Sequence, residues 1–208
     1  GEGRAFSKTH RSVNLTLDGG HRLAAAAWDV PRPTIAIRRH RLIDIDFDDL
    51  ATPSNPTMSP MITVDCANFL RAAIRARKSI VVCGDQDAGK TTLTRGLATA
   101  IDASENIGTV ETTRELHLDK LGRWRRVPVA WESREGSGER TASGELIGEV
   151  TVDQLLIDSL RFGLNRLFVG EVRGKEILAM FKAMQSGAGS MSTIHATCAK
   201  AAIDRMVT

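Results

Sequence analysis

The chain has few cysteines and no long apolar run, and both shortages limit what it can be. Cys66, Cys83 and Cys198 are an odd number at wide spacing, which argues against a disulfide framework or a paired-cysteine zinc site. No apolar segment approaches the roughly 20 residues that a membrane helix needs, and no basic start followed by an apolar core marks a secretory leader. We therefore expect a chain without a transmembrane segment of its own, in a reducing compartment.

A large charge excess is also missing. The sequence has 28 Lys and Arg against 25 Asp and Glu, and a formal net charge of +3 neither demands nor excludes a nucleic-acid partner. A hydrophobic content of 42% in 208 residues suffices for a sizeable core, which favours one domain or one plus a piece of another. Because the chain starts at Gly1 without a methionine and stops inside an expected helix over residues 199–207, we expect an excised piece of a longer protein.

The first 50 residues are typical of a β-rich region. Residues 13–17 and 21–26 predict two strands joined by a tight turn at Asp18-Gly19-Gly20, and residues 34–38 predict a third strand. Prolines and small polar residues at 51–60 resist regular structure. We interpret residues 1–50 as part of a β-rich amino-terminal domain and residues 51–60 as a linker.

From residue 61 to residue 208 the pattern changes to alternating helices and short apolar strands. Helices are expected at 65–77, 90–101, 151–161, 175–185 and 199–207, and strands at 80–83, 107–110, 167–169 and 191–194. This alternation predicts an α/β domain around a mostly parallel, buried sheet, truncated at its carboxyl terminus.

A phosphate loop is the clearest motif. Gly84-Asp85-Gln86-Asp87-Ala88-Gly89-Lys90-Thr91 fits G-x-x-x-x-G-K-[ST], directly after an apolar strand and at the start of a helix. Glycines let backbone N–H groups wrap a phosphate chain, Lys90 would reach the β and γ phosphates, and the Thr91 hydroxyl would ligate magnesium. The alternative is a chance Gly-Lys-Thr turn before an ordinary helix. The nucleotide-binding candidates, for ATP and Mg²⁺, are Gly84, Asp87, Ala88, Gly89, Lys90, Thr91 and Thr92.

Two acids in this loop oppose that interpretation. Asp85 and Asp87 stand where an anion should bind, and a like charge about 6 Å from a phosphate costs roughly 3 kcal/mol at an effective dielectric near 20. The cost disappears if both carboxylates point to solvent.

Glu171 follows an apolar strand, where a P-loop enzyme needs a second carboxylate for the water shell of magnesium. By itself such an acid is more often a helix cap or a surface charge. Its segment, Val169-Gly170-Glu171-Val172-Arg173-Gly174, is followed about 20 residues later by Gly189-Ser190-Met191-Ser192-Thr193-Ile194-His195-Ala196. With an acidic box at residues 109–116, these segments resemble the type II/type IV secretion ATPase family, especially its pilus-assembly branch.

The resemblance implies a RecA-like P-loop NTPase core and an ATP-hydrolysing motor that powers secretion or pilus assembly. It also implies a homo-hexameric ring in the full-length protein, working with inner-membrane secretion or pilus machinery. Such a protein is cytoplasmic and peripheral at the inner face of the membrane.

Resemblance and chemistry together give the roles of the candidate residues. Glu171 or Glu115 would polarise the attacking water, Thr91 and Glu171 would hold Mg²⁺, and Glu111 would help to hold the water and metal network. His195 would donate to the γ-phosphate and report its loss. The alternatives are an ordinary charge pair for the two box acids and a structural donor for His195. The catalytic candidates are Glu171, Glu115, Glu111, His195 and Arg173.

Arginines elsewhere have weaker assignments. Arg38 and Arg39 follow a strand in the region where family members present arginines across a domain or subunit boundary, so they are arginine-finger candidates as well as plausible surface residues. The run Gly122-Arg123-Trp124-Arg125-Arg126 and the stretch 132–144 predict a mobile insertion, with Trp124 a weak hint of nucleic-acid or partner binding.

Two rival functions stay open. A non-hydrolysing nucleotide-binding scaffold module is favoured by Asp85, Asp87 and Thr112, because the family's acidic box has aspartate at the position of Thr112. A nucleic-acid-dependent motor ATPase has only the arginine run in its favour, so nucleic acid is not the partner we expect.

Overall fold

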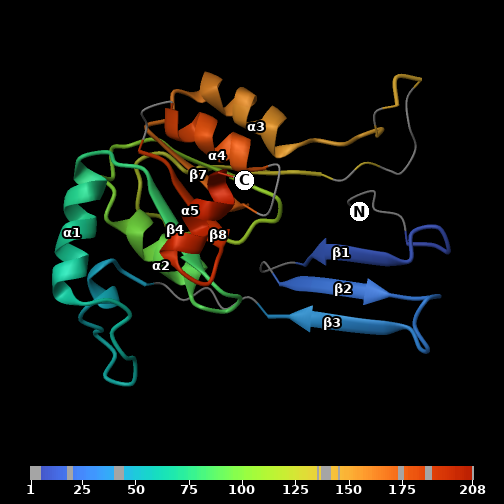
Figure 1. Cartoon of the computed structure of the whole chain (residues 1–208), viewed down its shortest axis with the longest axis horizontal. Helices are drawn as coiled ribbons and strands as arrows, with labels where there is room; N and C mark the ends of the chain where they lie inside the picture. The colour runs from blue at the N-terminus through green and yellow to red at the C-terminus, as the bar shows by residue number, and fades with distance from the viewer. Residues whose placement is uncertain are drawn as a thin grey trace. The chain divides into compact units, whose positions relative to one another are not determined.

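The computed structural model describes residues 6–17, 21–39, 45–134, 136, 142–144, 146–172, 176–185 and 189–207. The chain divides into two units, each with its own β-sheet: residues 1–43 with 134–149, and residues 44–133 with 150–208 (Figure 1). The boundaries predicted at residues 50 and 60, which separate the β-rich domain, the linker and the α/β domain, stay a prediction.

Three antiparallel strands form the sheet of the first unit, in the order β1 (Ser12–Thr16), β2 (Arg22–Ala26) and β3 (Thr34–Arg38). Their register places apolar residues opposite one another, with Leu15 facing Leu23 and Leu23 facing Ile37. The alternation of side chains along a strand collects these residues on one face. The three strands lie within one residue of their predicted bounds, and the turn predicted at residues 18–20 lies outside the described residues.

The second unit is built on a five-stranded parallel sheet in the order β4-β8-β7-β5-β6. The strands are β4 (Ile80–Gly84), β5 (Ile107–Glu111), β6 (Val129–Glu132), β7 (Arg166–Val172) and β8 (Met191–His195). Because all five run the same way, their carboxyl ends meet at one edge, where open α/β sheets bind ligands.

Helices α1 (Val64–Arg75), α2 (Lys90–Thr99), α3 (Val152–Ser159), α4 (Glu176–Gln185) and α5 (Ala199–Val207) belong to this unit, with short 3-10 turns η2 (Asp48–Leu50), η3 (Leu118–Lys120) and η4 (Leu160–Phe162). Two of the helix starts follow from local chemistry. The Thr63 hydroxyl accepts the N–H of Cys66 at the start of α1, and Thr151 and Gln154 form a capping box at the start of α3.

Consecutive residues of β7 point to opposite faces of the sheet and into two separate cores. Phe168 packs with Leu97 of α2 and the α1 side, whereas Val169 packs with Leu156 of α3 and Met180 of α4. The sheet is therefore sandwiched between helices, as Figure 1 shows for α1 and α2 against α3 and α4. The α/β class and the parallel sheet predicted from the alternation are confirmed.

One expectation is wrong. Trp124 does not lie on a mobile insertion, because it is 8% exposed and belongs to the core on the α1 and α2 side. The neighbouring Arg123 pairs with Asp46 at 2.6 Å. Shortly after this run the chain forms β6, a strand that the sequence did not predict, and β6 pairs with β5. Residues 135 and 137–141 of the second predicted loop, 132–144, lie outside the described part of the chain.

Across the described residues, no helix combines the length and the apolar character needed to span a bilayer.

Candidate nucleotide site

The phosphate loop connects the end of β4 to the start of α2 at the carboxyl edge of the parallel sheet. Gly89 has a φ of +85°, and a Cβ there would lie 2.7 Å from Met61 Cε, so only glycine fits. Asp87 also has a left-handed backbone, with a φ of 59°, which aspartate tolerates better than most residues. The loop thus curls tightly, a shape that directs backbone N–H groups toward an anion.

The Lys90 ammonium is held by the loop itself. Its Nζ donates to the carbonyl oxygens of Gly84 at 3.0 Å and Asp85 at 2.6 Å. A longer contact of 3.4 Å joins Nζ to Nδ1 of His195. A phosphate would compete with these acceptors for the ammonium protons, so a bound nucleotide must draw Lys90 away from them.

His195 lies between Lys90 and Glu171, because β8 lies between β4 and β7 in the sheet. Its Nε2 contacts Oε1 of Glu171. An ammonium can only donate, so the neutral imidazole accepts from Lys90 at Nδ1 and carries its proton at Nε2, from which it donates to the Glu171 carboxylate. An ammonium at the start of α2, an imidazole on β8 and a carboxylate on β7 are therefore linked in one chain of contacts.

The acidic box follows β5, two strands away from β8. Thr91, next to Lys90, directs its hydroxyl toward Oε2 of Glu115 at 3.4 Å. Glu111 is only 3% exposed, and its Oε1 accepts the backbone N–H groups of Glu115 at 2.9 Å and Leu116 at 3.1 Å. These contacts make Glu111 a support of the loop that carries Glu115.

Burial raises the pKa of Glu111 to about 7 from the usual 4.5. The two backbone N–H donors and the hydroxyl of Thr109 oppose this rise in pKa, and the nearby charge of Glu115 adds to it. Glu111 therefore changes its charge close to neutral pH.

These groups fit a magnesium-bound nucleotide in their chemistry. The Thr91 hydroxyl and the carboxylates of Glu115 and Glu171 are hard oxygen ligands of the kind that Mg²⁺ prefers. Lys90 and the amino end of α2 supply the positive partners for phosphate. Asp85 and Asp87 are exposed, so solvent screens their repulsion of an anion.

Four further predicted site residues are Arg38, Arg39, Thr92 and Arg173. Arg38 and Arg39 are exposed at the end of β3 in the first unit, and Thr92 is half-buried on α2. Arg173 lies outside the described residues.

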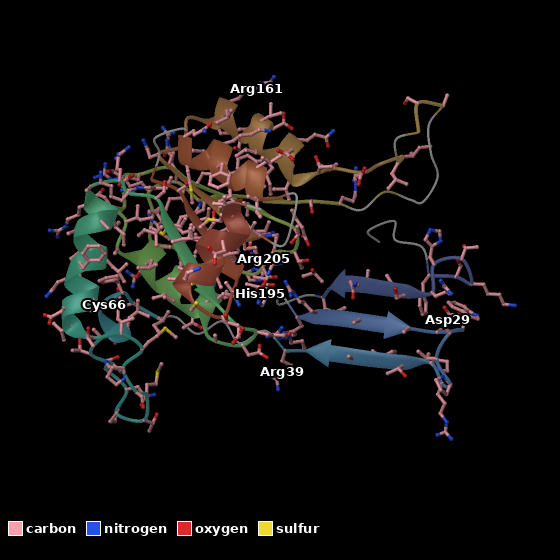
Figure 2. All side chains as sticks on the ribbon, viewed as in Figure 1. Asp29, Arg39, Cys66, Arg161, His195 and Arg205 are labelled. Atoms are coloured by element: carbon pink, nitrogen blue, oxygen red, sulfur yellow. The ribbon has the colours of Figure 1, made fainter. Side chains whose placement is uncertain are left out.

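The sequence analysis did not identify two arginines, Arg205 and Arg95, that donate to backbone carbonyl oxygens near the site. Arg205 of α5 donates from Nη1 to the carbonyl oxygen of His195 at 2.9 Å, and Figure 2 shows both residues at the end of β8. Arg95 of α2 is 5% exposed and donates to the carbonyl oxygen of Leu116. No local motif marks either contact, because each joins residues that only the fold brings together.

The family can now be assigned from this arrangement and from comparison with known proteins. The model of the family described as type II/IV secretion system protein matches residues 50–208. The chain belongs to this family. The phosphate loop, the acidic box, Glu171 and His195 all fall inside the matched residues.

Relatives and solved structures agree with the assignment. The type IV secretion system protein PtlH of Bordetella pertussis is 35% identical over 153 residues, which are 73% of this chain and 42% of PtlH. The chain thus spans less than half the length of this relative. The VirB11 ATPase of Brucella suis, crystallised with sulphate, is 23% identical with a TM-score of 0.54 over 97% of this chain and 63% of its own. The pilus retraction motor PilT with bound ADP is 20% identical with a TM-score of 0.61, over 97% and 55%. These likenesses support a RecA-like fold for the second unit.

Proposed function

We propose that this chain is part of an ATP-hydrolysing motor of a secretion or pilus-assembly system. The observation that carries the proposal is the convergence of Lys90, at the start of α2, with His195 and Glu171 near the carboxyl ends of β8 and β7, beside the hydroxyl of Thr91. A P-loop lysine in the same site as a carboxylate from another strand of the sheet, here linked to it through His195, suits phosphoryl transfer to water. The family membership adds independent support.

The residues divide the chemistry among themselves. Lys90 exchanges the carbonyl oxygens of Gly84 and Asp85 for phosphate oxygens when nucleotide binds. Thr91 and Glu171 hold Mg²⁺, which neutralises phosphate charge when it is bound. Glu171 also orients the attacking water, with Glu115 as the second candidate for that role.

His195 connects phosphate occupancy to Glu171. When Lys90 leaves Nδ1 for the phosphate, His195 loses its donor on that side while Nε2 still faces Glu171. The imidazole is then free to turn toward the γ-phosphate. Loss of that phosphate restores the original chain of contacts.

The whole protein would act as a homo-hexameric ring in the cytoplasm, peripheral at the inner face of the membrane. There it would work on inner-membrane secretion or pilus machinery. Arg38 and Arg39 are the candidates for completing a neighbouring nucleotide site, where an arginine neutralises charge on the transferred phosphoryl group.

A non-hydrolysing nucleotide-binding scaffold is the second candidate. It is favoured by the acids of the phosphate loop and by Thr112 in the acidic box. The exposure of Asp85 and Asp87 weakens this reading, since screened charges cost less than the roughly 3 kcal/mol of an unscreened contact. For the nucleic-acid motor only the exposed arginines of the run 122–126 remain, because Trp124 is buried and offers no stacking surface.

Turnover by the full-length protein and its Lys90→Ala variant decides between the ATP-hydrolysing motor and the non-hydrolysing scaffold. We expect ATP hydrolysis in the wild type and a loss of at least about a hundredfold in the variant, because Lys90 contacts the transferred phosphoryl group. The far-ultraviolet circular dichroism spectrum should not change, since Lys90 lies on a partly exposed loop end. A wild-type protein that binds ATP without hydrolysing it would establish the scaffold, and equal turnover in both proteins would remove Lys90 from the site.

A further inference from the structure

The peptide unit around Leu116 is held from two sides by buried charged residues. Its N–H donates to Oε1 of Glu111 at 3.1 Å, and its carbonyl oxygen accepts from Nη1 of Arg95. Glu111 comes from the end of β5 and Arg95 from the middle of α2. The Leu116 side chain, 3% exposed, anchors the same residue in the core.

Burying these two charges is expensive. Arg95 is 5% exposed and Glu111 is 3% exposed, and moving a guanidinium or a carboxylate out of water costs several kcal/mol unless hydrogen bonds compensate. Apolar side chains would pack α2 into the core without that cost, as Leu97 does two residues further along the helix. Arg95 and Glu111 each supply a directed hydrogen bond to one backbone unit, which apolar packing does not.

The residue fixed in this way lies next to Glu115. The Glu115 N–H donates to the same Oε1 of Glu111 at 2.9 Å, and its carboxylate faces the Thr91 hydroxyl at 3.4 Å. Thr91 and Arg95 are four residues apart on α2, so they lie on one face of that helix. The phosphate-loop helix therefore contacts the acidic-box loop at two points one turn apart.

We propose that Arg95 is a positioning residue for hydrolysis, which together with Glu111 fixes the Leu116 peptide and thereby the place of the Glu115 carboxylate beside Thr91. This inference rests on the proposed ATPase function. It assigns to a residue of the phosphate-loop helix a role at the acidic box, outside every motif of the sequence.

A purely structural Arg95 would affect folding alone, whereas a positioning Arg95 changes the chemical step. The test compares Arg95→Met, which keeps the apolar stem, and Arg95→Lys, which keeps a donor, in the full-length protein. We expect Arg95→Met to lower kcat about 10- to 100-fold, because a small misplacement of a reacting group has an effect of this size. KM for Mg-ATP should change less than about threefold. Arg95→Lys should retain at least about a third of kcat.

Arg123→Met is the matched control, because Arg123 also pairs through its guanidinium but with Asp46 at the surface. It should keep wild-type kcat. If Arg95→Met does not fold, Arg95→Gln replaces it, since the shorter amide keeps polarity but not the reach to Leu116. Wild-type kcat in folded Arg95→Met, or in folded Arg95→Gln where that variant replaces it, overturns the proposal.

Amide hydrogen exchange at residues 115 and 116 separates this inference from the proposed function. We expect exchange there to accelerate at least about tenfold in Arg95→Met, with the core strands unchanged. A wild-type protein without turnover refutes the ATPase function, and the exchange data still decide whether Arg95 fixes the loop. Unchanged exchange at both amides would overturn the inference even in an active enzyme.

Discussion

Among single residues, Glu111 has the least ordinary environment. Its carboxylate is almost wholly buried, yet Oε1 accepts two backbone N–H groups that favour the charged form. Burial is the larger effect and raises its pKa to about 7. A group that supports the Glu115 loop therefore changes its charge close to neutral pH.

This shift predicts a pH dependence of stability. The folded state binds the Glu111 proton more tightly than the unfolded state, so the contribution of Glu111 to stability is fully present below pH 4.5 and is lost as pH rises to about 7. The loss is on the order of 3 kcal/mol, from 1.36 kcal/mol per unit of pKa. Glu111→Gln keeps an acceptor for both N–H groups and cannot ionise, so its unfolding free energy should fall less over that range.

Urea denaturation of the wild type and Glu111→Gln at pH 5, 6, 7 and 8 measures the difference. The groups facing Glu111 are the Glu115 carboxylate, the Thr109 hydroxyl and the backbone of Gly170. Glu115→Gln is the control, because it removes the neighbouring charge and leaves the burial of Glu111 in place. Parallel stability profiles for the wild type and Glu111→Gln would contradict the raised pKa.

At the scale of elements, β7 contains an irregularity beside the candidate site. Its pairing with β8 shifts register between Val169 and Glu171, so Gly170 is the extra residue of a bulge. On its other side β7 lies so close to β5 that a Cβ on Gly170 would be 2.9 Å from Glu111 Cγ. A glycine here lets the strand carry Glu171 to the site while the buried Glu111 packs against its backbone.

Gly170→Ala should therefore disturb both the fold and the site. We expect a loss of roughly 1–3 kcal/mol of stability, as for overpacking of a core, and a fall in kcat of at least about tenfold as Glu111 is displaced. Gly163→Ala is the matched control, since Gly163 has a φ of +59° and nothing within 4 Å of a new Cβ. It should lose about 1 kcal/mol to backbone strain and leave kcat unchanged. Turnover equal to wild type in Gly170→Ala would show that the close approach has no role in catalysis.

The sequence predicted the elements with regular local patterns and missed those without one. The bounds of β3 and α5 agree with prediction, and α2 starts at Lys90 because the phosphate-loop motif dictates it. Strand β6 has only four residues, directly after Pro128 and an arginine run, so its local signal is that of a loop. Its position is set by pairing with β5, a long-range contact that no local pattern encodes.

The residues of the candidate site also divide into those with a local sequence pattern and those without one. Lys90 and Thr91 belong to one contiguous motif, and Glu171 and His195 each end a recognisable strand. The order of the strands, which brings His195 between Lys90 and Glu171, is a property of the sheet. The contacts of Arg95 and Arg205 connect residues 21 and 10 positions apart through backbone carbonyls, which any residue type offers.

For the whole molecule, the proposed ring allows neighbouring subunits to share each site. Head-to-tail interfaces generate closed rings, and in such a ring one surface of every subunit faces the nucleotide of the next. Arg38 and Arg39 are exposed on a unit other than the one that carries Lys90, and arginines supplied across a boundary raise hydrolysis rates by about 10³ to 10⁵ where they operate.

Mixing two inactive full-length variants tests this sharing. Lys90→Ala subunits keep their arginines, and subunits with Arg38→Ala and Arg39→Ala keep their phosphate loop. If the arginines act on the neighbouring subunit, random mixing at equal amounts creates intact sites at about a quarter of all interfaces, and activity rises well above that of either variant. If the arginines act within their own subunit, no subunit of the mixture carries an intact site. The activity of the mixture would then stay at the mean of the two variants. A mixture with the same turnover as its separate components would therefore contradict arginine action between subunits, while size measurements in the presence of ATP show whether mixed rings formed.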